Sequence, residues 1–178
     1  MSETNISQND MPPDRVTRFV SMVLDRCATD KGYAARLRRA DNPDTEYQSW
    51  EALAALGINL EKEYMRLPYA TVAAAMARSK AQQKGSMSLG RAIARCYEEG
   101  NTSDQAKAKL RRLLACEDVA ETCRILRPLL TLIQSRVSIP LDYVRLLNQL
   151  RRMYWRGQQV KAQWAQEFYS KATEEEAA

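Results

Sequence analysis

The spacing of apolar residues near the start of the chain is typical of an amphipathic α-helix. An α-helix turns once every 3.6 residues, so apolar residues three and four apart share one face. Six Gly and six Pro among 178 residues, with abundant Ala, Leu, Arg, Glu and Gln, favour helix over strand elsewhere. We predict an all-α protein, with eight or nine helices in two stacked bundles and no sheet. The first stripe comprises Val16, Phe19, Val20, Val23, Leu24 and Cys27.

Turn-forming segments divide the chain. The segment 98–104 (EEGNTSD) is typical of a loop, and we place the division between the two bundles there. A chain of 178 residues is long enough for two small domains that share an interface. The predicted regions are a disordered N-terminus (1–13), an N-terminal helical bundle (14–100), a C-terminal helical bundle (101–172) and an acidic tail (173–178).

Two helices near the C-terminus carry most of the functional argument. Pro140 is well placed to open the longer one, over residues 140–156, because its missing N–H matters least in a first turn. The last helix has Val160, Trp164 and Phe168 at four-residue spacing and should bury them. No apolar run approaches 18 residues and the N-terminus is polar, so we expect a cytoplasmic protein without a membrane partner.

Missing residue types argue against an enzyme. The chain has no histidine, which removes the commonest general base and metal ligand. Its four cysteines show no CxxC spacing, and it has no glycine-rich phosphate loop. Its acidic clusters fall in loops or at helix starts, where carboxylates serve as caps. We therefore expect no catalytic residue, no metal and no cofactor.

Positive charge is concentrated in the second half of the chain. Residues 1–85 carry 12 basic and 11 acidic side chains, whereas residues 124–161 carry eight basic side chains and only Asp142 as an acid. Arginine outnumbers lysine 19 to 8, and its planar guanidinium matches phosphate and can also stack on bases. A soluble surface usually intersperses both signs, so this excess favours a nucleic acid as the partner.

The helix predicted at 140–156 places arginines in a line. At about 100° per residue, Arg145, Arg152 and Arg156 share one side with Gln149, while Leu147, Leu150 and Tyr154 should face the core. These arginines span roughly 16 Å, enough to contact several phosphates of one strand. Trp155 at the flank is either half-buried core, which we favour, or a stacking face for a base.

Arginines elsewhere extend the candidate surface. Arg38 and Arg39 crowd a short helix, although Asp41 and Asp44 follow closely and can neutralise them internally. Others lie on the polar sides of helices in the second bundle. The candidate nucleic-acid-binding residues are Arg38, Arg39, Arg111, Arg112, Arg124, Arg127, Arg145, Arg151, Arg152 and Arg156.

Several segments together resemble one known family. The segment 86–95 (SMSLGRAIAR), the run Arg38-Arg39-Ala40 before an acidic loop, and LRPLLTLI at 126–133 occur in order. PLDYVRLLNQLRRMYWRG at 140–157 then leads into an aromatic-bearing last helix. Across about residues 14–170 the chain resembles the CasB family, the small subunit of the type I-E CRISPR surveillance complex Cascade.

The resemblance implies a non-catalytic, two-bundle helical protein. Members of this family form a pair inside Cascade, beside the backbone subunits that hold the guide RNA and near the large subunit. Their basic surface is thought to steady the R-loop by holding the displaced strand while guide RNA and target DNA pair. One departure is that Gln158 and Gln159 follow Gly157, where relatives can carry basic residues. Family basic positions match Arg38, Arg39, Arg112, Arg127, Arg152 and Arg156.

Two other functions remain open from the residues alone. A helical adaptor or scaffold could bind an acidic protein partner through the same basic surface. A sequence-specific transcription factor would need a recognition helix, and the chain has no recognisable helix-turn-helix pattern. The salt dependence of binding to bare single-stranded DNA separates the adaptor from the nucleic-acid-binding subunit.

Overall fold

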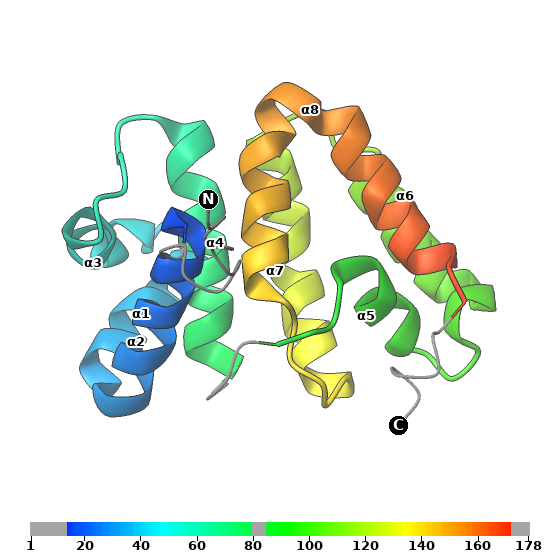
Figure 1. Ribbon diagram of the computed structural model, residues 1–178, viewed down its shortest axis with the longest axis horizontal. Helices are drawn as coiled ribbons and strands as arrows, with labels where there is room; N and C mark the ends of the chain where they lie inside the picture. Colours follow the sequence, from blue (N-terminus) through cyan, green and yellow to red (C-terminus); the bar gives the residue numbers. More distant parts are fainter. Residues whose placement is uncertain (1–13, 80–84, 172–178) are drawn as a thin grey trace, which may run out of the picture.

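The computed structural model describes residues 14–79 and 85–171, and these ranges are built from helices (Figure 1). The predicted all-α class is confirmed, since no strand occurs in them and one isolated bridge joins Met87 to Leu141. The eight α-helices of the described ranges are α1 (Arg15–Thr29), α2 (Lys31–Arg38), α3 (Trp50–Ala55), α4 (Glu63–Ser79), α5 (Leu89–Arg95), α6 (Asp104–Leu114), α7 (Val119–Arg136) and α8 (Tyr143–Tyr169).

Helix α4 lies at the centre of the packing. Figure 1 shows α1 to α4 on one side and α5 to α8 on the other, with α4 beside the first half of α8. Every residue of α4 from Leu67 to Ala77 is buried, because α2 covers one side of the helix and α7 and α8 cover the other. The buried apolar side chains form one cluster that runs from Val16 to Phe168.

The predicted division into bundles 14–100 and 101–172 stays a prediction. Helix α5, which falls in the first predicted bundle, packs chiefly against α8 and also contacts α6. The predicted disordered N-terminus (1–13) and the predicted acidic tail (173–178) lie outside the described residues.

The start of α8 differs from the prediction. Pro140 does not open the helix, which begins at Tyr143. The Pro140 carbonyl instead accepts a hydrogen bond from the backbone N–H of Met87 at 3.1 Å. Asp142 caps α8 instead, and its carboxylate accepts from the backbone N–H of Arg145 at 2.9 Å. Ser103 caps α6, and its hydroxyl accepts from the backbone N–H of Ala106 at 3.2 Å.

Helix α8 is bent back on itself, as its ribbon in Figure 1 shows. Arg156 has non-helical backbone angles (φ −133°, ψ 37°) and separates a first arm, 143–155, from a second arm, 157–169. The arms run antiparallel, because residues early in the first arm contact residues late in the second. The two helices predicted on either side of Gly157 are therefore present as one hairpin. We call residues 151–157 the apex of α8.

Gly90 lets α5 approach the second arm of α8 closely. A Cβ atom at this position would lie 2.7 Å from the Glu167 Cβ and 2.7 Å from the Phe168 backbone nitrogen, so any larger residue would force the two helices to shift. The Gly90 backbone N–H also donates to the Glu167 Oε2 at 3.0 Å. This contact gives a physical reason for the glycine in the segment SLGRA.

Candidate nucleic-acid interface

The ten candidate arginines differ in how open they are. Eight are exposed, whereas Arg127 and Arg151 are half-buried. They come from four places: the end of α2 and the turn after it, α6, α7, and the first arm of α8 with its apex. Which of them can meet a polyanion depends on the groups that surround each one.

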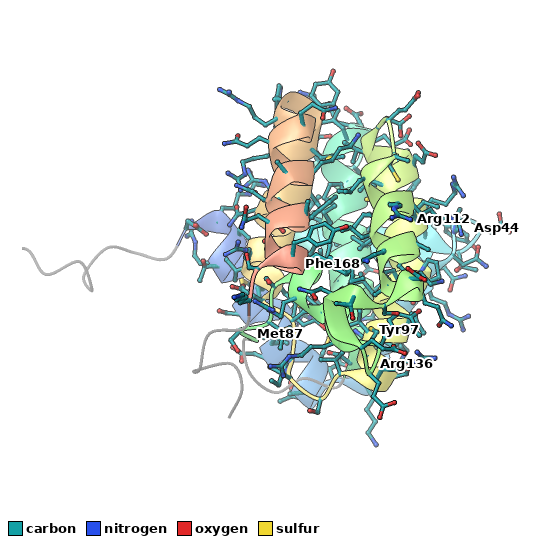
Figure 2. All side chains as sticks on the ribbon, turned by 90° about the vertical axis from the view of Figure 1, so that its right-hand side faces the viewer. Asp44, Met87, Tyr97, Arg112, Arg136 and Phe168 are labelled. Atoms are coloured by element: carbon teal, nitrogen blue, oxygen red, sulfur yellow. The ribbon has the colours of Figure 1, made fainter. Side chains whose placement is uncertain are left out.

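A groove between α6 and α7 gathers basic residues that lie far apart in the sequence. Its volume is about 320 Å³, and it combines a basic rim with an apolar floor. Lys109, which is not among the ten candidate residues, joins the predicted Arg112 and Arg124 there. Arg112 is labelled on α6 in Figure 2. The lining residues are Lys109, Arg112, Arg124, Ile125, Pro128, Leu129 and Leu132.

The charges of this groove are weakly neutralised within the chain. Arg124 approaches Glu121 at 3.5 Å on the same helix, but 61% of the arginine side chain and 39% of the glutamate side chain are exposed. Such surface pairs contribute little and are screened by salt. Lys109 and Arg112 form no ion pair with any described residue. The positive charge of the groove is therefore largely unneutralised by described acidic side chains.

Arg127 and Arg136 are less available than their neighbours. The Nε and Nη2 atoms of Arg127 are buried and have no hydrogen-bond partner among the described residues. Figure 2 shows Arg136 next to Tyr97, and its guanidinium carbon lies 5.2 Å from the ring centre. Arg136 also donates to the Cys96 carbonyl oxygen at 3.2 Å. Arg127 is half-buried, whereas Arg136 is exposed although its guanidinium contacts Tyr97 and Cys96.

The predicted line of arginines on α8 is interrupted at its first member. The Nε and Nη2 atoms of Arg145 each lie 2.8 Å from the Oε1 of Glu167 on the second arm. Gln149 donates to the same oxygen at 2.8 Å and accepts from the Trp164 indole N–H at 2.8 Å. We call Arg145, Gln149, Trp164 and Glu167 the arm network.

Two assignments of faces on α8 were wrong. Gln149, predicted on the polar side, is only 1% exposed, and Tyr154, predicted toward the core, is 59% exposed. The second arm covers a side of the first arm that a single-helix projection leaves to solvent. Gln149 can be buried there because the arm network satisfies both ends of its amide.

The apex of α8 is open. Arg156 is exposed and has no ion-pair partner among the described residues, and Arg152 reaches the Asn148 carbonyl and Gln163 side-chain oxygens only at 3.4 Å. Arg151 is half-buried, with its guanidinium carbon 6.0 Å from the Tyr69 ring centre. Trp155, which we expected to be half-buried, is 63% exposed.

The N-terminal pair Arg38 and Arg39 is exposed and forms no ion pair within the described ranges. Asp41, considered above as an internal neutraliser, contacts Arg78 of α4 instead. Asp44 is exposed and its backbone N–H bonds to the Asn42 side chain at 3.0 Å. Neither Asp41 nor Asp44 therefore forms an ion pair with Arg38 or Arg39.

Other chemical groups are placed as follows. All four cysteines are free, and burial raises the pKa of the Cys96 and Cys123 thiols to about 11, which keeps them protonated at neutral pH. Within residues 14–79 and 85–171, no three potential metal-ligating His, Cys, Asp or Glu side chains lie together. No helix in the same ranges is long and apolar enough to cross a membrane.

Fold and surface together define an all-α protein with a bent C-terminal helix and an arginine-rich surface. Residues 33–169 match the family model described as CRISPR-associated protein Cse2, and this match spans most of the chain. The chain therefore belongs to the Cse2 family, also called CasB, which supplies a subunit of type I-E Cascade. The resemblance stated from the sequence is confirmed.

Two solved structures are similar to this chain. CasB of M. ruber is 25% identical with a TM-score of 0.72, and the likeness covers 89% of this chain and 94% of that one. CasB from Thermobifida fusca is 19% identical with a TM-score of 0.62, covering 87% and 96% of the two chains, and shows the fold alone. No curated protein matches the sequence.

Proposed function

We propose that this protein is a non-catalytic small subunit of type I-E Cascade whose basic surface holds nucleic acid. The observation that carries the proposal is the set of exposed arginines that the fold leaves without acidic partners. They lie at the α6–α7 groove, at the apex of α8 and at the end of α2. In this role the surface stabilises the R-loop by holding the displaced DNA strand beside the guide RNA.

The physical argument rests on a small energy balance. An RNA–DNA hybrid is about as stable as the DNA duplex that it replaces, so contacts to the freed strand can decide whether the R-loop stays open. Exposed guanidinium groups supply such contacts without reading sequence, because they bind phosphates. The partners proposed are the guide-RNA-holding backbone subunits, the large subunit, a second copy of this chain, the guide RNA and the two DNA strands.

A second candidate function has one specific observation in its favour. The floor of the α6–α7 groove is apolar, with Ile125, Leu129 and Leu132 between the basic side chains. Such a groove also suits an acidic, amphipathic segment of a protein partner. In that case the protein is an adaptor or scaffold within its complex, and its affinity for bare nucleic acid is negligible.

Titration of the full-length protein with labelled single-stranded and duplex DNA tests the proposal. We expect weak binding without sequence preference, tighter for the single strand. Log affinity should fall with log salt by about 0.7 per neutralised phosphate, so three to five contacts give a slope of roughly −2 to −3.5. A salt-independent affinity, or none, would favour the adaptor. Co-purification with a guide-RNA-containing complex tests the assembly.

A further inference from the structure

Three aromatic side chains meet where α8 bends. The rings of Tyr64, from α4, and Tyr154 stack with their centroids 4.3 Å apart and their planes at 22°. Trp155 meets them edge-on, 5.9 Å from Tyr64 and 5.3 Å from Tyr154. We call these residues the aromatic cluster. Tyr154 is 59% exposed and Trp155 is 63% exposed, so much of this aromatic surface faces solvent.

The bend in α8 presents the cluster outward. The backbone leaves the helical region at Arg156, immediately after Trp155, and the second arm turns back along the first. The stack on Tyr64 fixes Tyr154 from one side, and both tyrosines then support the indole of Trp155. The two exposed rings are adjacent rather than scattered, and contiguous exposed apolar surface is a feature of interaction sites.

Positive charge surrounds the aromatic cluster. Arg151, Arg152 and Arg156 lie within four residues of Trp155, and no described acidic side chain forms an ion pair with them. Two exposed acids lie nearby, Glu63 beside Tyr64 on α4 and Asp14 before α1. The pKa of Asp14 is lowered chiefly by its hydrogen bond from the Thr17 backbone N–H and also by Arg151. The three arginines outnumber these two acids. Flat aromatic faces next to unneutralised guanidinium groups match a single strand, which offers unpaired bases between phosphates.

We propose that the aromatic cluster is a stacking platform for unpaired nucleobases, with Trp155 as the stacking face and Arg152 and Arg156 on the adjoining phosphates. The inference rests on the proposed function. It adds that this surface contacts the bases of the strand as well as its phosphates. Stacking on an aromatic face tolerates every base, which suits a strand of arbitrary sequence. It also distinguishes an open strand from a duplex, whose bases are already stacked on one another.

Two strands of equal length and charge test this inference on the full-length protein. The first is oligothymidine, and the second carries abasic sites at every position. We expect the wild type to bind oligothymidine about tenfold more tightly than the abasic strand. Trp155→Ala should remove that preference and leave the salt slope unchanged, while Trp155→Phe, which retains a ring, keeps most of it. Trp50→Ala, which removes a different exposed tryptophan on α3, should leave the preference unchanged.

The outcomes separate the inference from the proposed function. If wild type and Trp155→Ala bind both strands alike with a steep salt slope, the strand is held by phosphates alone and only the inference is overturned. If neither strand binds in a salt-dependent way, the inference and the proposed function fall together. If Trp155→Ala leaves DNA binding intact but weakens binding to purified Cascade subunits, the cluster is a protein contact and the inference is overturned.

Discussion

The two ends of the first arm of α8 carry the same sequence signal and have different surroundings. Arg145 and Arg152 are seven residues apart on one helix, and no acid other than Asp142 is near them in sequence. Arg145 nevertheless pairs with Glu167, which is only 8% exposed, whereas Arg152 meets only neutral oxygens. Local charge density identifies a basic segment, but the opposite arm decides which arginines stay free.

The antiparallel pairing of the arms explains the difference. The end of the second arm lies beside the start of the first, and this brings Glu167 next to Arg145. Toward the apex, the second arm offers Gln163 and then Lys161, Gln159 and Gln158, none of which is acidic. One end of the hairpin is therefore internally neutral and structural, and the other end is positive and open.

The largest expected effect comes from a substitution at the end of the hairpin where Glu167 pairs with Arg145, which we call the closed end. Gly90→Ala places a methyl group against the Glu167 Cβ and the Phe168 backbone, which cannot move aside as a flexible side chain would. We expect the free energy of unfolding in urea to fall by about 3 kcal/mol. Gly157→Ala is the matched control, because its nearest contact is the Met153 sulfur at 3.9 Å. Alanine at position 157 should raise the free energy of unfolding, by at most about 1 kcal/mol.

The next effect removes the acid of the arm network. Glu167→Ala leaves the Arg145 guanidinium, the Gln149 amide and the Gly90 N–H without their shared acceptor. We expect a loss of about 2 kcal/mol in the free energy of unfolding, discounted because the Arg145 side chain is 50% exposed. Glu51→Ala, an exposed acid on α3, should stay within about 0.5 kcal/mol. Equal stabilities of the two variants would mean that the network contributes nothing.

Most of the fold could be predicted because local spacing determines which face of a helix is apolar. The stripe from Val16 to Leu24 is buried, and Val160, Trp164 and Phe168 are each fully buried as expected. Gln149 was assigned to the wrong side because the second arm covers that part of the first arm. Tyr154 lies near the bend of α8, where its ring stacks on Tyr64 of α4 and stays exposed. A projection of one helix contains no information about such a neighbour.

Less of the candidate site could be predicted, because it depends on contacts between distant segments. Composition identified the arginine-rich segment but not the burial of Arg127 or the pairing of Arg145. Lys109 shares a face with Arg112, three residues on, and that spacing was the available signal for its place in the groove. Nothing in the sequence placed Tyr64, from α4, beside Trp155.

At the open end, charge reversal should act on binding rather than on folding. Arg152→Glu with Arg156→Glu replaces two attractive phosphate contacts by repulsive ones, and we expect more than tenfold weaker binding to single-stranded DNA at low salt. The free energy of unfolding, measured by thermal unfolding, should change by less than about 0.5 kcal/mol, because both side chains are exposed. In assembled Cascade the R-loop should be less stable and interference weaker.

The control for that variant is Lys31→Glu with Lys171→Glu, which changes the net charge equally at exposed positions outside the apex. An equal loss of affinity in both double variants would mean that only the net charge of the protein determines binding and that the apex does not contact the DNA strand. Loss of folding in the arginine variant would mean that these side chains support the hairpin after all.

The smallest expected effect is the sharpest comparison of the two ends. Arg145→Gln and Arg152→Gln each remove one positive charge from the same face of the same helix. Arg145→Gln should lower the free energy of unfolding by about 1 kcal/mol, because Glu167 keeps Gln149 and the Gly90 N–H as donors. Its affinity for single-stranded DNA should change by less than about twofold, because that charge is already neutralised.

Arg152→Gln should do the reverse. It removes a charge that no acid neutralises, so affinity should fall by about threefold to fivefold at low salt while stability stays within about 0.5 kcal/mol. Fluorescence anisotropy and urea unfolding on the same preparations measure both quantities. If the two variants lose the same affinity, Glu167 must release Arg145 when a strand binds, and the closed end of the hairpin belongs to the interface as well.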